Sequence, residues 1–446
     1  MTTFITAIVL FAVTYVLLFA LPKFRAYVAL GSAVIFSVWL TFFCPEINFG
    51  IAEIIDGIDF NVLMMIAGTM GIVSLFIESK MPMRIADVLL SKFKNVKLAI
   101  VAMALLAGIV SAFVDNVATV LMIAPIALAV CKKQNISPVS PIIAIAISSN
   151  LQGAATLVGD TTSILLGGYA DMTFFDFFVF KGRPGIFWAV ELGAIITAFI
   201  LLWIFRKETQ PLRLTDKTEV TDYVPSALMI GVVSLLICAS FIPEPTQSGA
   251  LLTLYGLRNG IICMTLLVIG IIINICKTKG FSAPKLVLKE MDYQTLLLLA
   301  SLFVVIQGIT SAGVIQKLAD FLAHLGGGNI FLMYTIIVFA SVLISAFVDN
   351  IPYVLTMLPV VEGVAMAIAP GDEVAKLLLF FGLLIGSTLG GNITPIGASA
   401  NITGIGILRK EGYEVKASDF MKISVPFTLT AVLSGYLFIW IFWGLF

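Results

Sequence analysis

Long apolar runs separated by short polar segments make up most of this chain of 446 residues. A helix needs about 20 apolar residues to cross the hydrocarbon core of a bilayer. Runs of about this length lie at 4–21, 26–43, 60–77, 186–205, 224–242, 259–276, 293–311 and 423–446. The first run lacks a basic start and a small-residue cleavage site, so we expect a retained helix and not a signal peptide. The pattern predicts an all-α polytopic membrane protein.

Four other apolar segments do not fit simple crossings. The segment 99–131 is too long for one helix and too short for two crossings with a turn, which favours a re-entrant hairpin turning near Asp115 and Asn116. A second hairpin is expected at about 329–370. The runs 138–170 and 376–407 carry Gly, Ser, Thr and Asn in their middles, which predicts crossings broken there. Irregular backbone at this depth must be buried in protein or line a watery cavity.

The two halves of the chain share sequence. SAFVDN occurs at 111–116 and again at 345–350, and residues 149–164 match 387–402. Asp59-Phe60-Asn61 also matches Asp292-Tyr293-Gln294, and the offsets of these matches are collinear. We therefore expect repeats at 1–205 and 224–446, joined by a cytoplasmic linker at 206–223. Five crossings and one hairpin in each repeat would place the second repeat upside down relative to the first.

The basic residues are unevenly distributed, although the net charge is zero. Because basic loops tend to stay cytoplasmic, we place the loops 22–25, 80–97, 131–137, 206–223, 277–292 and 408–422 inside. Only five of the 26 Lys and Arg residues then lie outside: Lys181, Arg183, Arg258, Lys317 and Lys376. Both termini would face out. The five cysteines show no metal-ligand spacing. Nothing in the charge pattern suggests a nucleic-acid partner.

Acidic residues within the apolar segments are the main chemical signal. Asp115, Asp160 and Asp349 lie in segments without Lys or Arg, so we expect no basic partner for them. A carboxylate at bilayer depth costs at least about 2.5–3.5 kcal/mol, so it should hold a proton or a cation, or face water. Alternatively, Asp115 and Asp349 only cap the second helix of each hairpin. Asp160 matches Ala398 in the other repeat, so duplication alone has not kept it.

Two glutamates, Glu191 and Glu362, lie nearer to the predicted ends of spans, where we expect them to reach water.

The hairpin turns and broken helices supply hard oxygen ligands for a small cation, and helix ends there offer N–H groups to an anion. The Na⁺ candidates are Asp115, Asn116, Asp160, Asp349 and Asn350. The other candidate contacts for the substrate or the coupling ion are Thr119, Ser149, Asn150, Thr156, Gly159, Thr161, Thr388, Asn392, Thr394, Gly397, Ser399 and Asn401. Each polar side chain could instead cap a helix or join two helices. We expect no cofactor beyond a bound Na⁺ or H⁺.

The segments SAFVDNVATVLMIAPI, SAFVDNIPYVLTMLPV and GGNITPIGASANITGIGI resemble the ArsB/NhaD branch of the ion-transporter superfamily. They resemble especially its members similar to the melanosomal P protein, and more distantly the divalent anion/sodium symporters. The resemblance implies an elevator-type transporter, often a homodimer. Its transport elements would be about 98–170 and 329–407, with the remaining spans as scaffold. In the related dicarboxylate carriers the hairpin tips read Ser-Asn-Thr, so the Asp-Asn tips here disfavour carboxylate transport.

These observations predict an ion-coupled secondary transporter that moves a small inorganic ion by alternating access. Na⁺/H⁺ antiport is the first hypothesis, and efflux of arsenite or another inorganic anion is the second. An intramembrane aspartic protease also uses two embedded acids, but here the acids recur in duplicated positions, so we do not expect an enzyme. A passive channel is a weaker alternative. We expect the protein in a bacterial or archaeal plasma membrane, with the transported ion, the bilayer and a second copy as its partners.

Overall fold

The computed structural model describes residues 2–211, 218–245 and 249–445, and these are almost entirely helical. The first half has α1 (Thr2–Ala20), α2 (Arg25–Phe43), α3 (Ile51–Asp56), α4 (Phe60–Glu78), α5 (Met81–Leu90), α6 (Val96–Ser111), α7 (Asn116–Gln134), α8 (Val139–Gly153), α9 (Thr161–Tyr169) and α10 (Ile186–Ile204). Short 3₁₀ turns η1 (Pro22–Phe24), η2 (Pro45–Ile47) and η3 (Phe175–Phe177) join some of them. A short two-stranded antiparallel ribbon, β1 (Val179–Phe180) and β2 (Arg183–Pro184), precedes α10.

The second half follows with a similar series. It has α11 (Val224–Ala239), α12 (Ala250–Gly256), α13 (Arg258–Thr278), α14 (Ser282–Glu290), α15 (Tyr293–Ser311), α16 (Val314–Leu325), α17 (Ile330–Ser345), α18 (Asn350–Ile368), α19 (Glu373–Gly390), α20 (Ser399–Lys410), α21 (Ala417–Ile439) and the π-helical turn η4 (Trp440–Gly444). Ten helices of the described ranges are long and apolar enough to cross a membrane. The prediction of a polytopic helical membrane protein is confirmed.

The same helix-starting residues recur in both halves, which explains why the two series of helices match. Asp59 caps α4 through Val62 N at 2.9 Å, and its repeat mate Asp292 caps α15 through Thr295 N at 3.0 Å. Asn95 likewise accepts from the third amide of α6, and Asn329 accepts from the first turn of α17. A side-chain oxygen at this position satisfies amides that have no partner inside the helix.

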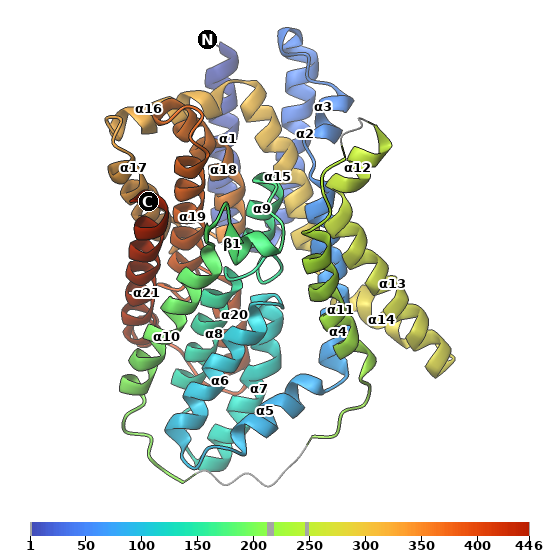
Figure 1. Cartoon of the computed structure of the whole chain (residues 1–446), viewed down its shortest axis with the longest axis vertical. Helices are drawn as coiled ribbons and strands as arrows, with labels where there is room; N and C mark the ends of the chain where they lie inside the picture. The colour runs from blue at the N-terminus through green and yellow to red at the C-terminus, as the bar shows by residue number, and fades with distance from the viewer. Residues whose placement is uncertain (1, 212–217, 246–248, 446) are drawn as a thin grey trace.

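When two helices pack together, the two helices equivalent to them by the repeat also pack together. The pair α2 and α15 corresponds to the pair α13 and α4, and α6 with α8 corresponds to α17 with α19. The two hairpins, α6–α7 and α17–α18, lie at opposite ends of the molecule in Figure 1, the first low and the second high. Their tips are the predicted turns at Asp115-Asn116 and Asp349-Asn350. The predicted inverted hairpins are confirmed.

Each predicted broken helix is present, and its second fragment packs across the repeat boundary. The breaks separate α8 from α9 and α19 from α20. The fragment α9 contacts α18 and α19 of the second half, while α20 contacts α7 and α8 of the first half. The two halves are therefore interleaved at the centre of the molecule and do not simply lie side by side.

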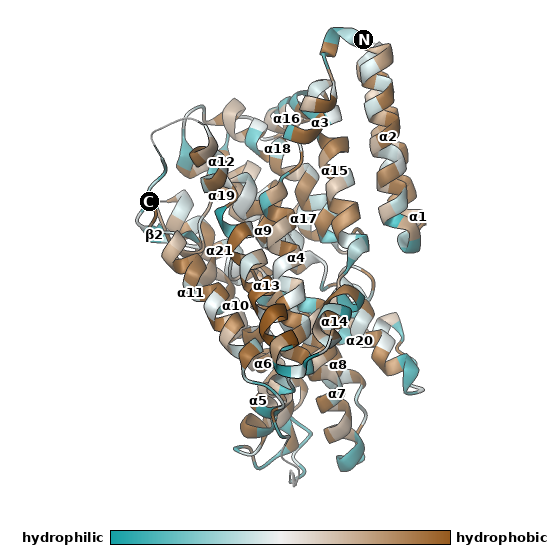
Figure 2. Ribbon diagram, turned by 90° about the vertical axis from the view of Figure 1, so that its right-hand side faces the viewer, coloured by the Kyte–Doolittle hydropathy of each residue, from teal (hydrophilic) through white to brown (hydrophobic). Residues whose placement is uncertain are grey.

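The two ends of the molecule are formed by different segments of the chain. Residues 206–211 and 218–223, α5 and the end of α7 lie at the lower end of Figure 1, whereas the N-terminus lies at the top. Hydrophobic residues predominate along the helices, and many hydrophilic residues lie in the loops and at helix ends (Figure 2). The turn between α1 and α2 is an exception, since it lies at mid-height in Figure 2 and not with the other basic loops.

Candidate functional site

The four helices that follow the two hairpin turns and the two helix breaks all begin at one cavity of about 370 Å³. Their first residues, Asn116 of α7, Thr161 of α9, Asn350 of α18 and Ser399 of α20, all line it. The charged residues of the lining are Arg25, Glu78, Asp115, Asp160, Glu290 and Asp292. Its wall also includes apolar side chains of α4. The cavity thus lies where the two hairpin tips meet the two helix breaks, as the sequence predicts.

Asp115, at the tip of the first hairpin, lines the cavity and caps α7. Its Oδ2 accepts hydrogen bonds from Val117 N at 3.0 Å and Ala118 N at 3.2 Å. No Lys or Arg of the described ranges forms an ion pair with it. It lies close enough to Asp292 and Asp160 for electrostatic repulsion between the carboxylates. Capping does occur, as the simpler alternative expects, but it leaves Oδ1 without a described partner.

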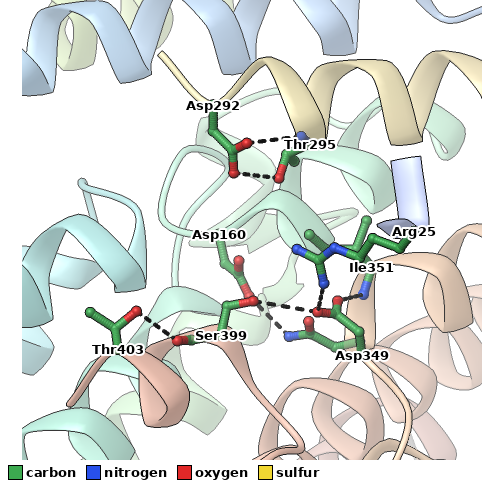
Figure 3. A network of polar contacts seen from close by, with 9 residues as sticks. Arg25, Asp160, Asp292, Thr295, Asp349, Ile351, Ser399 and Thr403 are labelled. Carbon is green, nitrogen blue, oxygen red and sulfur yellow. Dashed lines mark hydrogen bonds and ion pairs between the residues drawn. The ribbon is translucent and has the colours of Figure 1, made fainter. Parts of the chain in front are cut away.

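Asp349, at the tip of the second hairpin, has a basic partner, and here the prediction was wrong. Its Oδ2 pairs with Arg25 Nη1 at 2.5 Å and also accepts from Ser399 Oγ at 3.4 Å, while Oδ1 accepts from Ile351 N at 3.1 Å. Figure 3 shows the guanidinium reaching from the start of α2 to this carboxylate. The charge pattern assigned Arg25 to a surface loop. Arg25 and Asp349 are 324 residues apart in the sequence, and only the tertiary fold brings them together.

Asp160 is the most buried acid of the site, with only 4% of its surface exposed. It caps α9, accepting from Thr161 N at 2.7 Å, and its Oδ2 accepts from Thr162 Oγ1 at 3.1 Å. Asn350 of the second hairpin donates to the same Oδ2 at 3.4 Å, so this carboxylate joins the two repeats. Its repeat mate Ala398 precedes α20 and provides no side-chain cap.

A layer of buried amides and hydroxyls lies beneath the cavity and joins hairpins to broken helices. Asn116 Nδ2 donates to Asn150 Oδ1 at 2.8 Å, and Asn150 Nδ2 donates to Thr388 O at 2.7 Å and to Asn392 Oδ1 at 3.1 Å. Positions 150 and 388 are repeat mates, so this hydrogen bond joins equivalent positions of the two repeats. Ser149 Oγ donates to Asn116 O at 3.1 Å. These side chains position the tips rather than line the open space.

In both halves the backbone of the helix break packs directly against the hairpin tip. Thr156 donates to Ala112 O, and its mate Thr394 donates to Ala346 O. A Cβ at Gly159 would lie 2.6–2.9 Å from three carbonyl oxygens of the first half, and a Cβ at Gly397 would lie 2.6–3.0 Å from the three matching carbonyls. Only glycine allows this close approach of two backbones.

The predicted residues therefore divide into two groups. Those that line the cavity are Asp115, Asn116, Gly159, Asp160, Thr161, Asn350 and Ser399, with Asp349 reached through Arg25 and Ser399. Those that lie outside the lining and are buried are Thr119, Ser149, Asn150, Thr156, Thr388, Asn392, Thr394 and Asn401. Gly397 belongs with the second group because it serves the close packing of a tip.

Glu362 is partly exposed, in line with the expectation that it reaches water, and it also has protein partners. Tyr169 Oη donates to its carboxylate at 2.6 Å, and Lys376 Nζ lies 4.0 Å away.

Several polar lining residues were missed by sequence reasoning: Arg25, Thr69, Ser74, Glu78, Glu290, Asp292 and Thr295. Asp292 had a usable signal, because it begins a helix in both repeats and matches Asp59. Glu78 and Glu290 are the exposed last residues of α4 and α14, so the cavity lining includes side chains that reach solvent.

The lining is strongly acidic for a membrane protein. Five carboxylates face one guanidinium, and that guanidinium is already paired with Asp349, a sixth acid. No group of three or more His, Cys, Asp or Glu residues suited to a metal ion occurs in the described part of the chain. A bound Na⁺ would therefore combine one or two carboxylates with amide, hydroxyl or carbonyl oxygens, the hard ligands that such cations take.

Comparisons with known proteins agree with this architecture. The chain is 29% identical to a 46 kDa membrane protein of Mycobacterium leprae over 445 residues, 98% of each chain. It is 30% identical over 394 residues to an uncharacterized transporter of Mycobacterium tuberculosis, covering 86% of this chain and 87% of that one. The P protein of Mus musculus is 25% identical over 456 residues, covering 86% of this chain and 54% of that one, which confirms the resemblance inferred from the motifs.

Two solved transporters share the fold at low sequence identity. The YdaH transporter of Alcanivorax borkumensis superposes with a TM-score of 0.58 at 14% identity, over 93% of this chain and 96% of that one. MtrF of Neisseria gonorrhoeae gives 0.56 at 12% identity, over 89% and 83%. The family described as CitMHS, citrate transporter, matches residues 8–381, and the chain therefore belongs to this family of membrane transporters, not to a family of enzymes.

Proposed function

We propose that this transporter is a secondary antiporter that exchanges Na⁺ for H⁺ at the cavity between the hairpin tips. Asp115 and Asp160 would carry the cation or the proton in turn, because each carboxylate can hold only one of them at a time. The proposal includes alternating access, in which the cavity opens to one end of the molecule and then to the other.

One observation carries this proposal: Asp115 and Asp160 face a shared cavity and form no ion pair within the described ranges. Charged groups in a membrane interior are normally paired or functional. Here the available Arg25 is already paired with Asp349. An unneutralised pair of carboxylates attracts a cation and repels an anionic substrate, which supports cation coupling.

An anion is the second candidate substrate, and one specific feature favours it. Arg25 Nη1 and Ser399 Oγ, the latter on the first residue of the uncapped α20, both bind the same oxygen of Asp349. A carboxylate or oxyanion of a substrate could replace that oxygen, as a helix N-terminus and a guanidinium suit such groups. Citrate, named in the family description, and arsenite are the probes for this alternative.

A liposome assay separates these candidates. Purified protein is reconstituted with a pH dye inside, and Na⁺, Li⁺, K⁺, citrate or arsenite is added outside in turn. We expect proton flux with Na⁺ or Li⁺ and none with K⁺. The flux should disappear in Asp115→Asn and persist in Asp372→Asn, which changes an exposed cap of α19 that does not line the cavity.

Proton movement that follows citrate or arsenite, with no response to any cation, would reject the antiport proposal and favour the anion. Currents far above the turnover of a transporter would instead indicate a channel.

A further inference from the structure

Arg25 has a repeat mate, Arg258. Arg25 is the first residue of α2 and Arg258 the first residue of α13, and the offset of 233 is the same as that between Asp59 and Asp292. The duplication therefore relates the pair Arg25–Asp349 to a second possible pair, Arg258–Asp115. In each pair the arginine comes from one repeat and the hairpin carboxylate from the other.

Only one of these two pairs exists in the structure. Arg25 Nη1 lies 2.5 Å from Asp349, whereas Asp115 faces the cavity and has no basic partner in the described ranges. Arg258 instead donates from Nη1 to Tyr255 O at 2.8 Å and stacks on the Tyr255 ring at 3.9 Å. Its Nε is buried and has no hydrogen-bond partner.

This difference is what an inverted repeat produces when its cavity opens toward one end. In the opposite-facing state each element takes the surroundings that its repeat mate has here. Asp115 would then have the contacts that Asp349 has here, and Arg258 would have those that Arg25 has here. A buried donor without a partner is costly, so Arg258 gains a favourable contact when it meets the carboxylate.

We propose that Arg258 pairs with Asp115 in the opposite-facing state, and that the transporter exchanges this ion pair for Arg25–Asp349 as it changes conformation. The two arginines are positioning residues, each holding one hairpin tip at one end of the cycle. Exchanging one pair for an equivalent pair keeps the two states close in free energy, which a carrier needs to return. The inference rests on the alternating-access part of the proposed function.

Two matched reporter positions can test this exchange. Thr69 lines the cavity, and its repeat mate Leu302 is fully buried. In a background with the five native cysteines replaced, Thr69→Cys should react with a charged thiol reagent in the state described here, and Leu302→Cys in the opposite state. Labelling rates of these two reporters are measured in nanodiscs, without substrate, so that both faces are accessible.

Removing either arginine should shift the labelling in opposite directions. Arg25→Gln weakens the present state, so labelling of the reporter at position 302 should become faster and that of the reporter at position 69 slower. If one pair biases the equilibrium by a factor of ten, labelling of the reporter for the less populated state should change by up to roughly tenfold, and labelling of the other reporter should change less. Arg258→Gln should slow labelling at position 302. Lys23→Gln, which removes an exposed charge from the same turn as Arg25, should change neither rate.

Asp115→Asn removes the proposed Arg258–Asp115 pair from the carboxylate side. It therefore tests the same pair even if Arg258→Gln does not fold. It should slow labelling at position 302 as Arg258→Gln does, and the double variant should show no further decrease. An unchanged or faster rate at position 302 in Asp115→Asn, or in folded Arg258→Gln, would overturn the proposal. Failure of cation-driven proton flux in the wild type would reject the antiport function but leave this labelling result intact.

Discussion

The two SAFVDN tips have the same sequence but different electrostatic surroundings. Asp115 and Asp349 both cap the second helix of their hairpins through backbone amides. Asp349 is neutralised by Arg25, whereas Asp115 faces the cavity beside Asp160 and Asp292. The duplicated residue thus has two different environments in one conformation. Equal sequence in an inverted repeat does not imply equal surroundings in one conformation, because the cavity is lined by one tip carboxylate and not by the other.

The largest expected effect is the loss of the unpaired acids. Asp115→Asn keeps an oxygen that can cap α7 but removes the charge. We expect Na⁺-dependent proton flux to fall at least roughly 100-fold, because removing a charged partner at a buried site costs about 3 kcal/mol. Asp160→Asn should have a similar effect. Flux in proteoliposomes measures both, and full activity in both variants would remove these carboxylates from the mechanism.

Substitutions that disrupt the close packing of a hairpin tip on a helix break should lower the stability of the protein equally in either half. In Gly159→Ala and Gly397→Ala the new Cβ would meet carbonyl oxygens at 2.6 Å at its nearest. We expect each substitution to destabilise the protein by about 1–3 kcal/mol, as overpacking does. Thermal unfolding in detergent measures this loss. Gly406→Ala in α20 is the control, since a Cβ there meets nothing within 4 Å. Clearly unequal losses at positions 159 and 397 would argue against equivalent packing of the two tips.

A third variant tests the paired tip. Asp349→Asn leaves the Arg25 guanidinium without its partner in the cavity, so a positive charge would oppose the cation. We expect roughly tenfold weaker apparent affinity for Na⁺, the scale of an unfavourable charge in a partly hydrated site. Arg25→Gln added to Asp349→Asn should restore most of the affinity, but it should not rescue Asp115→Asn. Rescue of both aspartate variants would mean that the tips do not differ.

The smallest expected effect concerns the helix without a side-chain cap. Ala398 precedes α20 where Asp160 precedes α9. Ala398→Ser adds a short capping oxygen and should stabilise the protein by about 0.5–1 kcal/mol, with transport unchanged. Thermal unfolding and the flux assay check these two outcomes together. A loss of flux would show that the open end of α20 takes part in binding.

The sequence predicts the arrangement of helices well because membrane solvation imposes it. Segment length against bilayer thickness predicts the hairpins, and Gly-rich stretches inside apolar runs predict the breaks. The Arg25–Asp349 pair could not be predicted, since it joins positions 324 residues apart and no local pattern records that contact. Asp292 was noticed only as a repeated residue, although it lines the cavity. Local chemistry identifies which residues are unusual, and only the tertiary fold shows which of them meet.

The interleaving of the broken helices has a consequence for the origin of the chain. The fragment α9 packs on α18 and α19 as well as on α4 of its own half, and α20 packs on α7 and α8, so each second fragment packs against the other repeat. A half-length ancestor with this fold would have needed two copies inserted in opposite orientations in the same membrane. Fusion of two such genes would fix one copy in each orientation. After such a fusion equivalent positions of the two copies could diverge, and Asp160 and Ala398 differ in this way while Arg25 and Arg258 remain the same.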